Sequence, residues 1–253
     1  IRLERRFAGE IGVDMPYSKA SAYSNQINAD FRLKKQSKIS ILVAIHDFFD
    51  SPHSYGDNLF SDFMEWLEFL SDIAKKTDYD WYIKTHPDVV GDGEAIITKF
   101  VNENAEFTLV PKEISHLQLI SDGINVVLTI FGTISSEYAY LGKLAINASV
   151  NNPHISYGFC LNPNSIQQYS DMIQNLPSLI QNFVPKKSEI LEFYFMHHIY
   201  RLKTWVFYDL QEAVSKLGGY AQMIDWGIFR YYLTGDNSIQ GSEIENAIKS
   251  FLN

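Results

Sequence analysis

The sequence predicts an α/β protein with a doubly wound parallel sheet and an aromatic-rich helical C-terminal tail. Short apolar runs rich in β-branched residues alternate with segments of helical periodicity over residues 38–176. That alternation is typical of a parallel sheet with helices on both faces. From about residue 188 the pattern changes to aromatic residues at helical spacing. We therefore expect a lead-in over residues 1–37, a sheet domain over residues 38–184 and a helical extension over residues 185–253.

The composition is that of a folded globular protein, with 46% hydrophobic and 20% charged residues among 253. No apolar run reaches the ~18 residues that a membrane-spanning helix needs, and the charged N-terminus does not resemble a signal peptide. The net charge of −9 argues against general nucleic-acid binding. The single cysteine, Cys160, excludes an internal disulfide and a cysteine-cluster zinc site, and it fits a reducing cytoplasm. Because the chain does not begin with Met, we expect a fragment or a missing start.

The elements are expected in a regular order along the chain. The lead-in contains one helix and ends in a basic patch at residues 32–38. Apolar runs predict strands at residues 39–45, 80–84, 107–110, 126–131 and 144–148, with a late short strand at residues 155–159. Helical spacing and capping residues predict helices at residues 58–75, 93–102, 113–120, 134–141 and 165–175. In the tail, we expect burial against another body for Phe193, Phe195, Trp205 and Phe207.

Three polar turns follow strands of the expected sheet, at residues 46–58, 85–88 and 132–137. The carboxyl ends of parallel strands share one edge, and ligands of doubly wound sheets gather there. The sequence therefore predicts one binding site built from these three turns.

The third turn carries the side chains best suited to an anion. Gly132 ends the strand, and Thr133, Ser135 and Ser136 open the next helix. Hydroxyls and free backbone N–H groups at a helix start can bind phosphate, and the carboxylate of Glu137 could accept hydrogen bonds from sugar hydroxyls. The same residue types are also common as helix caps, so both interpretations stay open.

The first turn contains a group of potential metal ligands: His46, Asp47, Asp50 and His53. Carboxylates and histidines in loops are more often solvated or capping groups than ligands. We therefore expect no metal at this turn.

Two of these segments resemble a known family. The motifs KTHP at residues 84–87 and GTISSEYAYLGKLAI at residues 132–146 resemble those of bacterial capsule and surface-polysaccharide glycosyltransferases of the GT-B type. The nearest group in pattern is that of capsular Kdo transferases, with CDP-glycerol glycerophosphotransferases more distant. The loop HDFFDSPH at residues 46–53 also resembles the first loop of such donor domains. The resemblance covers residues 38–176 and implies the Rossmann-like C-terminal half of a GT-B enzyme, which binds a nucleotide sugar.

The resemblance also implies roles for individual residues. His86 matches the HP histidine near the donor phosphate and is the expected catalytic residue, while Glu137 matches the carboxylate that holds the ribose. The further residues expected to contact the nucleotide sugar are Gly132, Thr133, Ser135, Ser136, Lys84 and His46. A full GT-B enzyme has two such domains, and this chain has room for one plus a tail. The catalytic base, which the acceptor domain usually supplies, is therefore expected to be missing or to lie in residues 1–36.

The expected function is transfer of a sugar from a nucleotide sugar, with a CMP-linked donor as one candidate, to a capsule or surface polysaccharide. The expected partners are that donor and a glycan or lipid-linked glycan acceptor. Peripheral membrane association is also expected, together with either a homodimer or a missing N-terminal domain. Neither nucleic acid nor a separate cofactor is expected. Two alternatives stay open, a UDP-sugar 2-epimerase-like isomerase and a non-catalytic nucleotide-sugar-binding module. Donor hydrolysis with and without an acceptor would separate the three.

Overall fold

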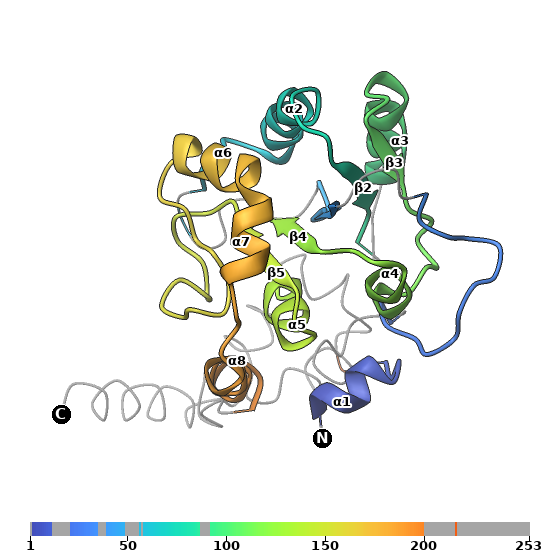
Figure 1. Ribbon diagram of the computed structural model, residues 1–253. Helices are drawn as coiled ribbons and strands as arrows, with labels where there is room; N and C mark the ends of the chain where they lie inside the picture. Colours follow the sequence, from blue (N-terminus) through green and yellow to red (C-terminus); the bar gives the residue numbers. More distant parts are fainter. Residues whose placement is uncertain are drawn as a thin grey trace. The chain divides into compact units, whose positions relative to one another are not determined.

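A sheet of five parallel strands forms the centre of the protein, in the order β3-β2-β1-β4-β5 (Figure 1). The computed structural model describes residues 2–11, 21–34, 39–48, 56, 58–86, 92–199 and 216. The strands are β1 (Ser40–Ala44), β2 (Asp80–Lys84), β3 (Phe107–Leu109), β4 (Val126–Thr129) and β5 (Leu144–Asn147). The predicted α/β class and all-parallel sheet are therefore confirmed.

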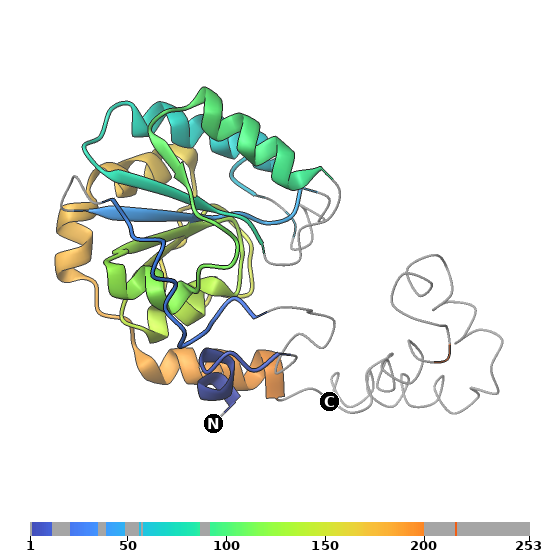
Figure 2. The same cartoon turned by 90° about the vertical axis from the view of Figure 1, so that its right-hand side faces the viewer.

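Helices cover both faces of the sheet (Figures 1 and 2). On one face lie α2 (Phe63–Ala74), α3 (Gly93–Glu103), α6 (Ile166–Gln174) and α7 (Leu176–Asn182). On the other lie α4 (His116–Asp122), α5 (Ile134–Tyr140) and α8 (Lys187–Tyr194), with α1 (Arg2–Phe7) outside α5. None of the helices in the described part of the chain combines the length and apolarity that a membrane crossing requires.

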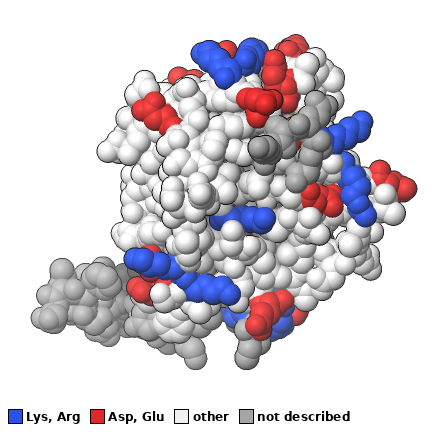
Figure 3. Space-filling model, viewed as in Figure 1, with Lys and Arg blue, Asp and Glu red and all other residues white. Residues whose placement is uncertain are grey.

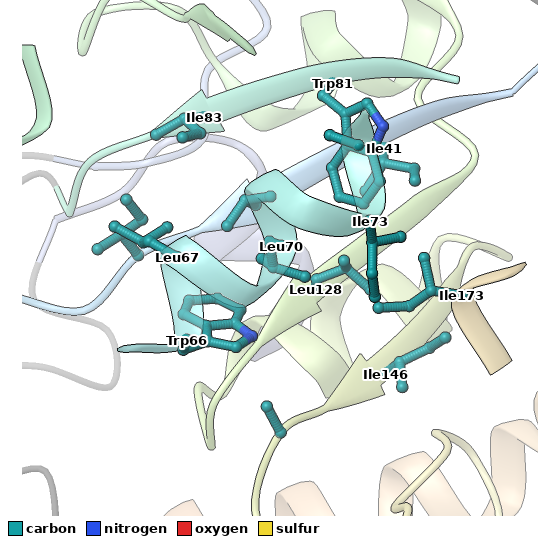
Figure 4. Close-up of a cluster of buried hydrophobic side chains, with 14 of the residues drawn as sticks. Ile41, Trp66, Leu67, Leu70, Ile73, Trp81, Ile83, Leu128, Ile146 and Ile173 are labelled. Carbon is teal, nitrogen blue, oxygen red and sulfur yellow. The ribbon is translucent and has the colours of Figure 1, made fainter. Parts of the chain in front are cut away.

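Strand alternation divides the apolar side chains between the two faces. In β1, Ile41 and Val43 point toward α2, while Leu42 and Ala44 point toward α5. The face under α2 is packed with large side chains, as Figure 4 shows for Ile41, Trp66, Leu67, Leu70, Ile73, Trp81, Ile83, Leu128, Ile146 and Ile173. Because the strands are buried on both faces, they appear in the sequence as continuous apolar runs.

The lead-in packs onto the opposite face through backbone and side-chain hydrogen bonds. The backbone N–H of His116 donates to the carbonyl of Ala22 at 3.0 Å, and the Ser115 hydroxyl donates to the carbonyl of Ser24 at 2.9 Å. The Gln118 amide donates to the carbonyls of residues 28 and 31. Residues 22–31 are therefore attached to the start of α4, rather than being only a connecting segment.

The chain divides into two units, Ile1–Tyr194 and Phe195–Asn253. Helix α8, which the sequence placed in the C-terminal extension, thus belongs to the first unit, where Phe193 is buried and Tyr194 packs with Leu3 and Phe7. In the second unit a π-helix, η1, spans Phe195–Ile199, and Phe195 is 47% exposed in the single chain, so its burial against another body stays a prediction. Trp205 and Phe207 lie outside the described residues.

The late strand expected at residues 155–159 is wrong. This segment forms turns, in which the N–H of Ile155 donates to the carbonyl of Asn152 and the N–H of Tyr157 to the carbonyl of His154. The residue that pairs with the sheet is Leu161, which forms an isolated parallel bridge to Ile146. Of the apolar residues in this stretch, Phe159 is buried and Ile155 is 43% exposed, and neither pairs as a strand.

Candidate functional site

The turns at the carboxyl ends of β1, β2 and β4 lie on one edge of the sheet because these strands are parallel. Strands β1 and β4 are neighbours, and the strand order reverses between them. His46 follows β1 and Gly132 follows β4, so both lie at the position where doubly wound sheets bind ligands. His86 follows β2 on the same edge. The candidate site is therefore the carboxyl edge of β2, β1 and β4, seen side-on in Figure 2.

His46 holds the turn after β4 in place. Its Nε2 lies 3.2 Å from the Thr129 hydroxyl and accepts a long hydrogen bond of 3.5 Å from the backbone N–H of Phe131. Its ring lies against Phe63 and Phe131, with ring centres 5.5 and 4.3 Å away. Burial, and then the nearby charge of His86, lower the pKa of His46 to about 3. At neutral pH this imidazole is uncharged, so it positions the turn without attracting an anion through charge.

Gly132 is required by the same close packing. A Cβ at this position would lie 2.9 Å from the Thr129 hydroxyl oxygen and 3.5 Å from His46 Nε2. A Cβ here would therefore crowd the Thr129 hydroxyl, while its contact with the His46 ring would be an ordinary one.

The start of α5 uses most of its polar groups inside the protein. The backbone N–H groups of Ser135 and Ser136 donate to the carbonyls of Gly132 and Thr133 at 3.1 and 3.0 Å. The Ser135 hydroxyl donates to the Asn147 amide oxygen, and the Ser136 hydroxyl donates to the carbonyl of Thr133. The expectation of free backbone N–H groups at Ser135 and Ser136 is thus corrected, because the chain closes a tight turn there. Thr133 makes no side-chain capping bond.

Glu137 is buried and bound by two residues of the lead-in. Arg6 Nε donates to its Oε1 at 2.5 Å, and the Tyr23 hydroxyl donates to its Oε2. The side chains of Arg6 and Glu137 are 15% and 7% exposed. Burial, and then the charge of Glu137, raise the pKa of Tyr23 well above its ordinary value, so this phenol remains a donor. Contact of Glu137 with a ribose stays a prediction, and it requires at least one of these partners to move.

Lys84 is also held inside the protein. Its Nζ donates to the carbonyls of Lys112 at 2.7 Å and Pro111 at 3.2 Å. Burial lowers the pKa of Lys84 to about 8, against the opposing effect of Glu113. The amine therefore carries a positive charge at pH 7, but it points to the loop before α4. Direct contact with phosphate stays a prediction.

The buried imidazole of His116 lies with its Nδ1 2.8 Å from the Tyr138 hydroxyl. The pKa of His116 is lowered well below its ordinary value by burial first, and then by Lys84, Arg6 and His86. Since α4 begins just beyond the carboxyl end of β3, these groups gather near the candidate site. His86 is half-buried, and its charge contributes to lowering the pKa of both His46 and His116.

Arg6 and Tyr23 were missed by the sequence analysis. They lie 131 and 114 residues from Glu137 along the chain, and no local motif connects them to it. Asp50 and His53 of the first turn lie outside the described residues. Within the described residues, no three of the His, Cys, Asp and Glu side chains are grouped as a metal site would require.

Comparison of the chain with protein-family models and with curated proteins gave no match.

Proposed function

We propose that this chain is the donor-binding domain of a GT-B-type glycosyltransferase that transfers a sugar from a nucleotide donor to a bacterial capsule or surface polysaccharide. The observation that carries the proposal is the placement of Lys84, His86 and Gly132 at the carboxyl ends of β2 and β4, on one edge of a doubly wound sheet. Nucleotide phosphates favour such a place, since buried basic groups attract anions strongly at low local dielectric. The remaining support is the resemblance of residues 84–87 and 132–146.

In this proposal His86 is the group that contacts the donor phosphate, as a ligand or as a proton donor to the leaving nucleotide. Gly132 and Thr133 line the phosphate, because the Thr133 hydroxyl is not used as a cap. The sugar's anomeric carbon loses the nucleotide oxygen and gains the acceptor oxygen, and the acceptor's proton passes to a base from the acceptor domain. Glu137 holds the ribose once its contacts with Arg6 and Tyr23 are rearranged.

A non-catalytic nucleotide-sugar-binding module is the second candidate, and one observation favours it. Glu137, the carboxylate assigned to the ribose, is enclosed by Arg6 and Tyr23. A protein that binds a donor only when this contact opens could serve as a sensor or scaffold.

The proposal is tested by titrating CMP, CDP, UDP and GDP into the chain and by following hydrolysis of matching nucleotide sugars with and without acceptor glycan. We expect binding of one nucleotide class and turnover that rises with acceptor. Binding without turnover would favour the non-catalytic module, and a changed sugar without acceptor would favour an epimerase. If none of the four nucleotides binds, the proposed function is wrong.

Two variants locate the site within that experiment. His86→Ala should lower the affinity for the nucleotide but leave the affinity for the matching nucleoside almost unchanged, because the nucleoside has no phosphate. Glu137→Gln should lower the affinity for both nucleotide and nucleoside by roughly tenfold, about 1.4 kcal/mol, since a charged acceptor for the ribose is lost. Glu103→Gln, an exposed carboxylate on α3, is the matched control and should change neither affinity.

A further inference from the structure

The two arginines of α1 differ in their surroundings, although they are adjacent in sequence. Arg5 pairs with Glu10 at the surface, with both side chains about half exposed. Arg6 pairs with Glu137, and both side chains are largely buried. Arg6 also lies over the ring of Tyr23, with its guanidinium carbon 5.6 Å from the ring centre. Only the second pair joins the lead-in to the candidate site.

Other contacts besides this buried pair also hold the lead-in in place. Leu3 and Phe7 pack with Tyr23 and Tyr194, and Phe7 stacks on Tyr140 at 5.7 Å between ring centres. Residues 22–31 are attached to α4 by the hydrogen bonds described above. A buried ion pair contributes little net stability compared with apolar residues of similar size, because both charges lose their hydration. What the charges add is the ability to exchange partners.

We propose that a bound nucleotide separates the Arg6–Glu137 pair, with the ribose hydroxyls replacing Arg6 on Glu137 and a phosphate replacing Glu137 on Arg6. This inference rests on the proposed function and adds Arg6 as a phosphate-binding residue. A guanidinium fits phosphate as well as it fits carboxylate, because both present paired oxygens. The position of Arg6 agrees with this role, since its charge acts on His116 together with those of Lys84 and His86.

The exchange predicts opposite effects on nucleosides and nucleotides. A nucleoside must break the pair to reach Glu137 and gives Arg6 no new anion. A nucleotide breaks the same pair and supplies a phosphate in return. Removing Arg6 therefore frees Glu137 for a nucleoside but takes a phosphate contact from a nucleotide.

The test is calorimetric titration of CMP and cytidine, and of UDP and uridine, into wild type, Arg6→Ala and Arg5→Ala. For the nucleotide that binds, we expect Arg6→Ala to weaken affinity by roughly tenfold or more and to strengthen the matching nucleoside severalfold. Arg5→Ala removes a neighbouring charge of the same helix from an exposed pair, so it should leave both affinities unchanged. The nucleotide-to-nucleoside ratio is the decisive quantity, because a loss of folded protein would affect both ligands alike.

Other outcomes overturn the inference in distinguishable ways. If Arg6→Ala changes nucleotide and nucleoside affinity equally, or neither, the pair is a structural link and the proposed function still stands. If wild type binds no nucleotide, the proposed function fails and this inference fails with it. Should Arg6→Ala not fold, Arg6→Gln serves instead, because it keeps most of the side-chain length and removes the charge. It should likewise weaken nucleotide binding and strengthen nucleoside binding, and equal or absent changes would contradict the exchange.

Discussion

The two faces of the sheet are built by different kinds of interaction. Under α2 the core consists of large apolar side chains, with Trp66 and Leu70 fully buried. Under α4 and α5 the layer includes buried polar groups, among them His116, Gln118 and Glu137, whose partners come from the lead-in or from neighbouring helices. The apolar packing on the first face is non-directional, and its strength depends on the volume that the side chains fill. The hydrogen bonds and ion pairs on the second face depend on specific donors and acceptors. In the proposed function, the face under α2 maintains the fold, and the face under α4 and α5 is the one whose contacts rearrange.

On the face drawn in Figure 3, most of the visible Lys and Arg lie close to Asp or Glu, while one basic side chain near the centre is surrounded by uncharged atoms.

The largest expected effect is on the apolar face. Trp66→Ala removes a fully buried ring and its hydrogen bond of 3.0 Å to the Tyr169 hydroxyl, so the free energy of unfolding should fall by about 3–5 kcal/mol. Urea unfolding followed by circular dichroism measures this change. Val184→Ala changes a side chain that is 80% exposed, so it should leave the midpoint of urea unfolding unchanged. A small loss in Trp66→Ala would mean that this face tolerates cavities and does not dominate stability.

The next effect is on the polar face. Arg6→Ala leaves the carboxylate of Glu137 buried with the Tyr23 hydroxyl as a donor, so unfolding free energy should fall by about 3 kcal/mol. In the double variant with Glu137→Gln, much of this loss should return, because no uncompensated charge remains. The same urea experiment checks both, and equal stability of the single and double variants would contradict the assigned ion pair.

The helices and strands of both faces could be largely predicted from the sequence, and the long-range polar contacts of the second face could not. The strand at residues 80–84 was predicted with the bounds of β2, and α6 lies within the helix predicted at residues 165–175, since hydrophobic period and capping are local signals. The bonds of Glu137 to Arg6 and Tyr23 join residues more than 100 positions apart, so no local pattern reports them. Buried polar partners are chosen by the folded geometry, and Arg6 in the sequence differs in no visible way from Arg5.

A change of pH should affect both faces through one histidine each. Folding lowers the pKa of His46 to about 3 and that of His116 well below its ordinary value, so the unfolded chain binds more protons below pH ~6.5. Their contribution is complete above that pH and is lost as the pH falls, by up to about 1.4 kcal/mol per pH unit for each group. Unfolding curves at pH 7, 6 and 5 should therefore show flatter pH dependence in His46→Gln and His116→Gln than in wild type. A slope as steep as that of wild type in either variant would exclude that histidine as a buried neutral group.

The smallest expected effect compares the helix starts on the two faces. On the apolar face, the Ser165 hydroxyl accepts a hydrogen bond of 3.2 Å from the N–H of Gln168 and caps α6. On the polar face, Thr133 holds the same position before α5 but makes no such bond. Ser165→Ala should therefore reduce unfolding free energy by about 1 kcal/mol and leave nucleotide affinity unchanged. Thr133→Ala should show the reverse, with stability nearly unchanged and nucleotide affinity reduced, because its hydroxyl is available to a phosphate. Thermal unfolding with and without the nucleotide measures both quantities for each variant. If Thr133→Ala destabilises the protein as much as Ser165→Ala and binds nucleotide normally, Thr133 acts as a cap in solution and its hydroxyl does not belong to the site.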